Sequence, residues 1–233
     1  EEKTGQKGFA FQMKPDPYNF EMYLWSNGTA YCDEDGQMAG QIDSKESQEV
    51  FKMFQDMEKD GYAIATEKNG TDEFRAGTVA MYVYGSWSIA SLNEDGMNYG
   101  VAKIPSFDGK TSVSILSSSG LSISKDSKNK DAAWEFVKWL CYDMQQEVVD
   151  GLGFFSVLKD APSPTVDLTD DYKAAYDVIS AAAASDNTVG FRSSFYTKLN
   201  DVLFDQLQLL GTGAATPEEA AAAMAEAAAG ISK

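Results

Sequence analysis

Apolar residues recur at helical spacing along much of the chain. One such stretch begins near Asp43, which is followed by Glu46 in a pattern that resembles a capping box, and it ends at Gly61. Its apolar positions follow one another at steps of three and four residues: Val50, Phe51, Phe54 and Met57. This pattern predicts an amphipathic helix between residues 43 and 61.

A second strong helix is predicted to begin at Asp131 and to end at Gly151 and Gly153. Its apolar stripe consists of Phe136, Leu140, Met144 and Val148, widened by Val137 and Cys141. Three more helices are expected near residues 170–184, 194–210 and 217–229. The last has Thr216 at the N-cap, Pro217 at the first helical position and Glu219 to complete a capping box.

Alternating positions predict few strands. Residues from Val79 to Tyr84 alternate after a short helical turn that ends at Phe74, and a second short strand is expected at 99–103. Two strand-like pieces flank a serine-rich bend in 112–124. The first 40 residues are rich in aromatic and turn residues and suggest a loop, a short helix and a hairpin, with a tight turn at Asn27-Gly28. Helices outnumber and separate the strands, which favours an α/β fold with a small sheet.

Composition removes several classes of function. The chain has 233 residues, no histidine and a formal net charge of -17, and its 19 basic residues form no cluster. This charge disfavours nucleic acid and direct membrane binding. The missing histidine excludes Ser-His-Asp catalysis, Cys-His catalysis and histidine-containing metal sites.

No motif for a cofactor or a metal survives inspection. A loop around Gly36 mimics part of a calcium loop, but Tyr31 and Ile42 would occupy the first and last ligand positions. We therefore predict no metal and no cofactor. The 36 acidic residues leave a glycosidase-like carboxylate pair open, although no pair stands out, and we name no catalytic residue. Cys32 and Cys141 stand in unrelated contexts, as reduced core residues or as a disulfide.

Aromatic residues beside small polar residues form the most informative pattern. The four instances are Asp16-Pro17-Tyr18, Trp25-Ser26-Asn27, Tyr84-Gly85-Ser86-Trp87 and Phe195-Tyr196. A sugar needs such a pairing, because its C–H face stacks on a ring while carboxylates and amides bind its hydroxyls. The alternative is that these rings form the core of an aromatic-rich protein.

The order of the central segments adds a resemblance. The stretches DEFRAGTVAMYVYGSWSIASL, NYGVAKIPSFDGK and GLSISKDSKNKDAAWEFVKWL follow one another with characteristic spacing. They resemble the carbohydrate-binding extracellular solute-binding proteins of bacterial ABC importers, the family that includes maltose- and maltodextrin-binding proteins. The likeness covers essentially the whole chain, up to TPEEAAAAMAEAAAGISK at its end.

The resemblance implies an α/β fold of the periplasmic-binding-protein type II, with two lobes that close on a ligand. Members of that family are much longer, so the chain is expected to lack most of the N-terminal lobe. Residues 1–102 and 160–233 would then belong to the C-terminal lobe, and 103–159 would cross to the N-terminal lobe. The chain begins at Glu1 without a methionine, and we expect it to be part of a longer protein.

The resemblance also implies ligand-binding residues. Asp16 would take sugar hydroxyls while Tyr18 stacks, Trp87 matches the stacking tryptophan of a Gly-x-Trp turn, and Tyr196 falls where relatives place another aromatic platform. Asn200 replaces a basic residue that some relatives use, which leaves the exact sugar open. Ser118 and Ser119 lie at a crossing loop that either lines the cleft or is only a polar bend.

The function implied is that of the substrate-binding component of an ABC sugar importer, without enzymatic activity. Its partners would be a sugar or oligosaccharide of the maltodextrin type and the membrane permease, and the full-length protein would be a monomer. It would work at the extracellular face of the membrane as a lipoprotein, or in a periplasm. The alternatives are a carbohydrate-active enzyme, a binding protein for a non-sugar solute, and an interaction domain without a ligand.

Overall fold

The computed structural model describes residues 4–12, 17–33, 35, 37–66, 68–107, 109, 112–115, 120–152, 156, 158, 160, 188–189 and 196–230. These residues belong to two compact units. Unit 1 comprises 1–84, 103–116 and 185–233, and unit 2 comprises 85–102 and 117–184. These units are defined by contacts within this chain and are not the two lobes that the family resemblance implies. The lobe boundaries near residues 102 and 160 therefore stay a prediction.

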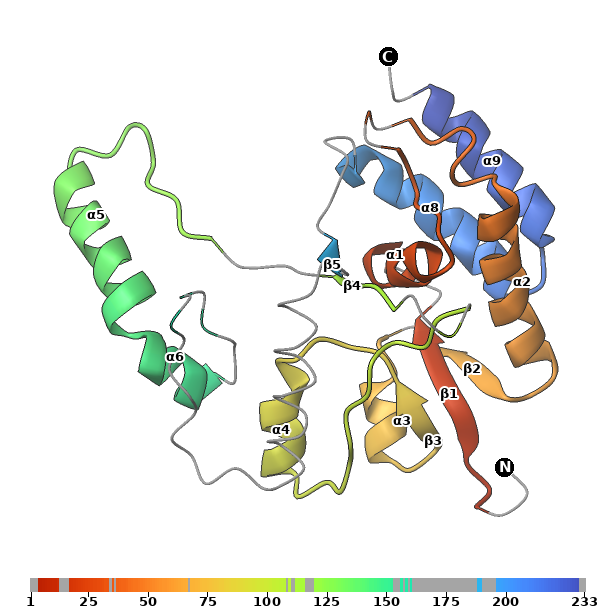
Figure 1. Cartoon of the computed structure of the whole chain (residues 1–233), viewed down its shortest axis with the longest axis horizontal. Coiled ribbons are helices and arrows are strands. Elements are labelled where there is room, and N and C mark those ends of the chain that lie inside the picture. The colour runs from red at the N-terminus through yellow and green to blue at the C-terminus, as the bar shows by residue number, and fades with distance from the viewer. Residues whose placement is uncertain are drawn as a thin grey trace. The chain divides into compact units, whose positions relative to one another are not determined.

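A three-stranded parallel sheet forms the centre of unit 1 (Figure 1). The middle strand β1 (Lys7–Gln12) pairs with β2 (Ala63–Thr66) on one side and with β3 (Val79–Tyr82) on the other. Phe9 is the partner of Ala63 in one ladder and of Met81 in the other. Because all three strands run in the same direction, their carboxyl ends lie at one edge of the sheet.

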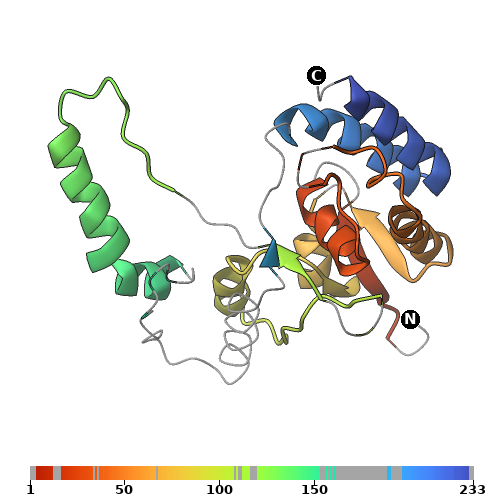
Figure 2. The ribbon, with the colours of Figure 1, turned by 45° about the horizontal axis from the view of Figure 1, so that its top comes forward.

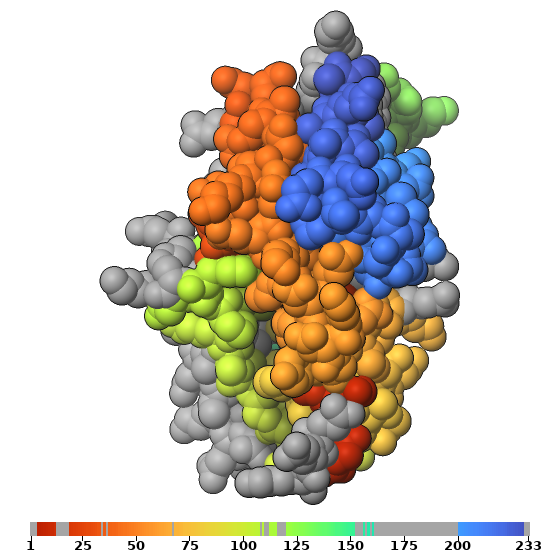
Figure 3. Space-filling view, turned by 90° about the vertical axis from the view of Figure 1, so that its right-hand side faces the viewer, coloured from red at the N-terminus to blue at the C-terminus, as the bar shows by residue number. Residues whose placement is uncertain are grey.

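Four helices build the main hydrophobic core together with one face of β1: α1 (Pro17–Ser26), α2 (Lys45–Lys59), α8 (Tyr196–Gly211) and α9 (Pro217–Ala229). The pair α8 and α9 pack side by side (Figure 2), and α9 also contacts α2 (Figure 3). The largest fully buried side chains of this core are Tyr31, Phe51, Phe54, Leu24, Ile42, Leu203, Leu207, Leu210 and Met224.

The short helix α3 (Thr71–Arg75) packs against the sheet beside β3. Gly70 precedes it with a φ of +83°, and a Cβ added there would come within 2.7 Å of the Ala10 Cβ. The Phe74 ring lies 5.0 Å from the Tyr82 ring. A residue without a side chain is therefore required where the chain passes β1 into α3.

Two helix caps were predicted: the cap of the last helix, α9, is confirmed, whereas the cap of α2 lies one residue later than predicted. α9 has the full capping box, in which the Glu219 N–H donates to the Thr216 Oγ1 and the Glu219 carboxylate accepts from the Thr216 N–H. The N-cap of α2 is Ser44, whose Oγ accepts from the Ser47 N–H at 3.2 Å. Asp43 instead accepts from the Gly40 N–H, so its predicted role as the cap is wrong.

The first 40 residues differ from the expected loop and hairpin. The expected short helix is present as α1, but the strand β1 precedes it, and Asn27-Gly28 ends α1 rather than turning a hairpin. Gly28 has a φ of +79°, its N–H donates to the Trp25 carbonyl, and the Thr29 N–H donates to the Leu24 carbonyl at 3.0 Å. These bonds form a Schellman motif, which uses the same glycine that a tight hairpin turn would use.

Unit 2 contains α4 (Ser88–Glu94), α5 (Lys130–Lys138), a π-helical segment η1 (Trp139–Asp143) and α6 (Gln145–Leu152). The predicted continuous helix from Asp131 is therefore interrupted. In η1 the Met144 N–H donates to the Trp139 carbonyl at 3.1 Å, which adds one residue to that turn. The extra residue shifts the stripe that follows it by one position: Gln145 and Val149 are buried, where Met144 and Val148 were predicted. Phe136, which precedes η1, is exposed.

The remaining expectations have mixed outcomes. The strand at 99–103 is wrong, since residues 97–106 form no ladder and the Tyr99 hydroxyl donates to Asn93 in α4. Of the two pieces in 112–124, one is β4 (Ser114–Ile115), which pairs in parallel with β5 (Thr188–Val189), and residues 120–124 are not a strand. The helix expected near 170–184 lies outside the described residues. Among the described residues, no helix has the length and apolarity that crossing a bilayer requires.

Candidate functional site

The carboxyl edge of the sheet in unit 1 holds a small hollow. Open α/β sheets bind ligands at this edge, because the loops that follow parallel strands meet there. β1 ends at Gln12 and β3 ends at Tyr82, one residue before Val83, and both Gln12 and Val83 line the hollow. The position of the hollow therefore follows from the topology of the sheet.

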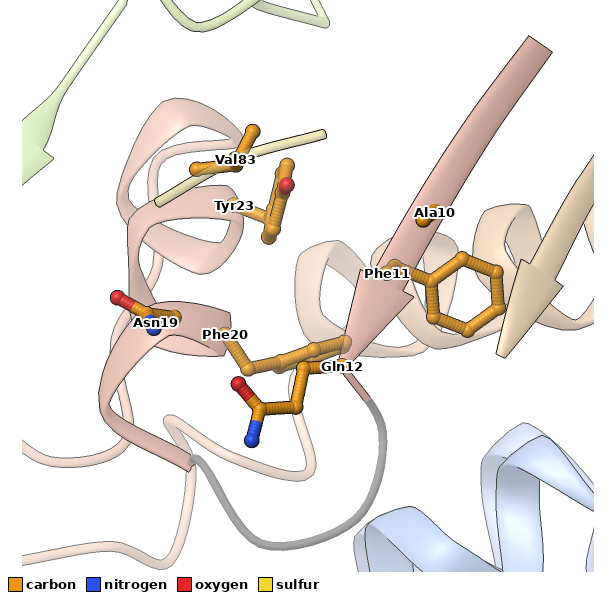
Figure 4. A pocket seen from close by; sticks show the side chains of 7 residues that line it. All are labelled: Ala10, Phe11, Gln12, Asn19, Phe20, Tyr23 and Val83. Atoms are coloured by element: carbon orange, nitrogen blue, oxygen red, sulfur yellow. The ribbon is translucent and has the colours of Figure 1, made fainter. Parts of the chain in front are cut away.

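The hollow is a shallow depression open to solvent, and the space around it that is free of atoms, open solvent included, is about 280 Å³. Seven residues line it (Figure 4). They are Ala10, Phe11 and Gln12 of β1, Asn19, Phe20 and Tyr23 of α1, and Val83, which follows the end of β3.

The aromatic side chains of the lining also belong to the core. Phe11, Phe20 and Tyr23 are buried, and each has its ring within 5.1 Å of the Phe54 ring. Tyr23 meets Phe54 edge to face at 4.6 Å. These contacts fix the rings in place, so the hollow has a rigid apolar floor.

Polar groups in the lining are neutral. Gln12 and Asn19 contribute carboxamides and are half-buried, while burial raises the pKa of the Tyr23 phenol well above its usual range. The phenol therefore keeps its proton at any physiological pH. Among the described residues of the lining, none carries a charge. Such a lining suits a neutral ligand with hydroxyl groups, because amides and phenols both donate and accept.

Helix α1 brings its three lining residues together by its periodicity. Asn19 and Tyr23 are four residues apart and lie on the same side of the helix, with Phe20 beside them. Pro17 occupies the first helical position, where its missing N–H costs nothing. The Schellman motif at Gly28 closes the other end, so both ends of the helix are defined by local sequence.

The predicted site residues are only partly described. Tyr18 lies in the first turn of α1 and Tyr196 is the first residue of α8, two helices of unit 1 that pack against each other, and their side chains are not described. Asp16, Ser118 and Ser119 lie outside the described residues. Asn200 is half-buried in α8. The roles of all these residues stay predictions.

Trp87 lies in unit 2, directly before α4. Its side chain is 47% exposed, so it does not belong to an enclosed core. A Cβ added to Gly85 would overlap the indole ring, which shows that the ring folds back over the glycine backbone. Gly85 is thus required for this placement of Trp87, and the stacking role of Trp87 stays a prediction.

Sequence reasoning missed Gln12 and Asn19 because it missed β1. The alternation of Phe9 and Phe11 was a usable signal, since both rings face the same core. With β1 assigned, Gln12 becomes the last residue of a parallel strand, where binding residues are expected. Asn19 then follows as the first polar position of the next helix.

Neither cysteine is among the residues that line the hollow. Within the described residues no disulfide is formed: Cys32 is buried in unit 1 and Cys141 is half-buried in η1. No group of three or more acidic or cysteine side chains in this same part of the chain is arranged to hold a metal ion.

The overall fold matches that of known ligand-binding proteins. The GacH receptor of Streptomyces glaucescens, whose structures include a complex with acarbose, superimposes with a TM-score of 0.71 at 25% identity, over 99% of this chain and 60% of its own. A cyclo/maltodextrin-binding protein complexed with maltotetraose gives a TM-score of 0.76 at 20% identity, over 99% and 60% of the two chains. The fold is thus of the periplasmic-binding-protein type II.

The family follows from the sequence match. The model of the family described as bacterial extracellular solute-binding protein matches residues 1–178, and the chain belongs to this family. The maltotriose-binding protein of Pyrococcus abyssi is 30% identical over 145 residues, which are 57% of this chain and 31% of that protein. The chain therefore spans about a third of this relative and about 60% of the similar solved structures.

Proposed function

We propose that the chain is the ligand-binding part of a sugar receptor that serves an ABC importer. It binds a sugar or oligosaccharide of the maltodextrin type without covalent chemistry and delivers it to the membrane permease. The family is extracellular, and we place the protein at the outer face of the membrane with a lipid anchor, or in a periplasm.

The hollow at the carboxyl edge of the sheet carries this proposal. A sugar ring presents an apolar C–H face and several neutral hydroxyls, and the hollow presents a fixed aromatic floor beside the amides of Gln12 and Asn19. The Tyr23 phenol adds a group that stays neutral. Affinity would come from apolar contact with the floor and from hydrogen bonds to the rim.

Similar proteins support the choice of ligand. Solved structures of similar fold include complexes with acarbose, maltotriose and maltotetraose. One protein of similar fold, UgpB of Mycobacterium tuberculosis at 17% identity, was solved in complex with a solute that is not a sugar, glycerophosphocholine. The neutral lining favours the sugar, because a phosphodiester needs a cationic or strongly donating partner.

The residues predicted from sequence take supporting roles in the proposal. Asp16 would bind sugar hydroxyls, and Tyr18, Trp87 and Tyr196 would each offer an aromatic face. The exposed ring of Trp87 supports its assignment as a platform. The serines of the crossing loop, Ser118 and Ser119, would add hydroxyl contacts.

Calorimetric titration of the chain with maltotriose tests the proposal. We expect saturable binding of one maltotriose, a change in tryptophan fluorescence that Trp87→Phe diminishes, and no response to glycerophosphocholine. Binding of glycerophosphocholine in preference to maltotriose would contradict the choice of ligand. Absence of any response to maltotriose would contradict the proposal as a whole.

Product analysis separates the receptor from a carbohydrate-active enzyme, which would use the same aromatic and acidic side chains. After long incubation with a panel of oligosaccharides, we expect every sugar to be recovered intact by chromatography. Shorter products that form in proportion to the protein concentration would replace the receptor assignment with an enzymatic one.

A further inference from the structure

The Ser26 side chain forms hydrogen bonds with both backbone polar groups of Val113, which lies 87 positions further along the chain. Ser26 is the last residue of α1 and is 2% exposed. Its Oγ accepts from the Val113 N–H at 3.1 Å and donates to the Val113 carbonyl at 3.4 Å. Val113 is itself buried, so these bonds form away from water, where a lost partner is costly.

Apolar contacts surround these two bonds. Trp25 packs with Ala30 and Val113 in a small cluster of its own, which Ile115 joins from β4. The Trp25 indole N–H is buried without a hydrogen-bond partner, so its ring contributes to this cluster by packing. Gly28 and the Schellman motif fix the end of α1 at this place. Hydrogen bonds, apolar packing and the helix end together therefore hold Val113 against the end of α1.

The strand that begins beside Val113 has a special place in the chain. β4 starts at Ser114, and the chain leaves unit 1 after residue 116. It re-enters unit 1 at residue 185, and β5 at 188–189 pairs with β4. The strand pair β4–β5 thus joins the outgoing and the returning segment inside unit 1.

The other part of α1 lines the hollow. Asn19 lies seven residues before Ser26, which corresponds to about 10 Å along a helix at 1.5 Å per residue. A helix of this length is stiff, so a displacement of the end that lines the hollow also displaces the end that is bound to Val113. Ser26 is not among the residues that line the hollow, so its hydroxyl does not act there directly.

We propose that Ser26 is a positioning residue that couples the hollow to the β4–β5 pair. Through Ser26, α1 and the segment that leads out of unit 1 move as one body, so a ligand on Asn19 and Tyr23 restrains β4. The nature of that ligand rests on the proposed function, whereas the coupling itself is a property of the protein without ligand.

Ser26→Ala tests the coupling against the matched control Ser47→Ala. Ser47 is also fully buried, and its Oγ donates to the Gln41 carbonyl at 2.8 Å. Its other hydroxyl contacts, with Ser44 and Thr29, also leave Val113 untouched, so its loss removes buried hydrogen bonds that do not involve Val113. In the protein without ligand, we expect Ser26→Ala to accelerate hydrogen exchange of the Val113 and Ile115 amides about tenfold or more. We expect Ser47→Ala to leave these two amides unchanged.

NMR resonances of the hollow provide the second readout. We expect Ser26→Ala to shift the carboxamide signals of Asn19, which Ser47→Ala does not, and to weaken maltotriose binding about threefold or more. Ser26→Thr retains the hydroxyl and should restore the slow exchange at Val113; it also serves if Ser26→Ala does not fold. Unchanged exchange at Ile115 and unchanged Asn19 signals in Ser26→Ala would overturn the coupling.

The outcomes distinguish the two proposals. If wild-type protein ignores maltotriose, the proposed function fails, while the exchange rates and the Asn19 signals still decide the coupling. If both alanine variants weaken maltotriose binding equally and only Val113 exchanges faster in Ser26→Ala, then Ser26 is merely structural and the coupling is wrong.

Discussion

At the scale of single residues, the account depends on two neutral carboxamides above a fixed aromatic floor. Gln12 and Asn19 come from different elements, and neither belongs to a recognisable motif. The candidates that the sequence suggests are mainly aromatic and acidic residues, with two serines, because aromatic and acidic side chains have a specific chemistry that can be recognised without a fold. Amides are common on protein surfaces, so they become informative only when the fold puts them beside a hollow.

Asn19→Leu tests the contribution of one of these amides. The change keeps the size and shape of the side chain and removes its hydrogen bonds, so we expect the affinity for maltotriose to fall about tenfold, as for about 1.4 kcal/mol. The free energy of unfolding should change by less than about 0.5 kcal/mol, as at most half-buried surface positions. Calorimetry and urea unfolding measure the two effects. Asn98→Leu, at an exposed position of unit 2, is the control and should leave the affinity unchanged; equal affinities of both variants would contradict the role of Asn19.

Glu58 predicts a small dependence of stability on pH. Partial burial raises the pKa of its carboxyl, and a hydrogen bond from the Ala65 N–H opposes this shift only in part. The folded state therefore binds the proton more tightly than the unfolded state, and stability falls as pH rises through the carboxyl range. At pH 7, Glu58→Gln should stabilise by about 0.5 kcal/mol or less, because water screens a half-exposed group.

Urea unfolding at pH 7 and at pH 3 checks this sign. The advantage of Glu58→Gln should vanish at pH 3, where the wild-type carboxyl is itself protonated. Glu226→Gln, at an exposed position of α9, should show no advantage at pH 7. A Glu58→Gln variant that is less stable than wild type at pH 7 would contradict the reading.

At the scale of elements, the cap of the last helix and the periodic helix near residues 45–59 were predictable, whereas the cap of that helix at Ser44 and the short central strands were not. The helices at 45–59 and 217–229 follow from apolar spacing and capping residues within a few positions. β1 was missed because a central strand depends on partners far along the chain: Phe9 pairs with Ala63 and with Met81. The π-turn after α5 was also not predictable, since the helical stripe continues through it in the sequence.

Thr216→Ala tests the cap of the last helix. The Thr216 Oγ1 accepts from the Glu219 N–H, and its loss should cost about 1 kcal/mol in the free energy of unfolding. Thr212→Ala is the control, because its exposed hydroxyl donates to carbonyls at the end of α8 and satisfies no N–H group of a helix start. Thermal or urea unfolding compares them. A smaller loss for Thr216→Ala than for Thr212→Ala would show that the box contributes little.

At the scale of the whole molecule, charge and exposed apolar surface act against each other. The net charge is -17 at pH 7, and the isoelectric point lies near 4.3. Unit 2 exposes the large side chains Trp134, Phe136, Trp139 and Tyr142, each by 44% or more. Repulsion between copies should keep the protein dispersed at neutral pH, and these side chains should promote association where the charge disappears.

Light scattering at pH 7 and near pH 4.5 measures this association. We expect a monomer at pH 7 in low salt and larger species near pH 4.5, and the double change Trp134→Ser with Tyr142→Ser should reduce the larger species. Leu209→Ser removes an exposed apolar side chain from α8 and is the control. Association that is insensitive to the double change would place the contact elsewhere.

The most direct test of the sugar-binding account is NMR titration of the chain with maltotriose, observing the side-chain amides of Gln12 and Asn19. This measurement detects weak binding and reports where it occurs. We predict progressive, saturable shifts of both carboxamides and of the Tyr23 ring, with glycerophosphocholine causing none. Unchanged signals of all three residues at high maltotriose concentration would contradict the account.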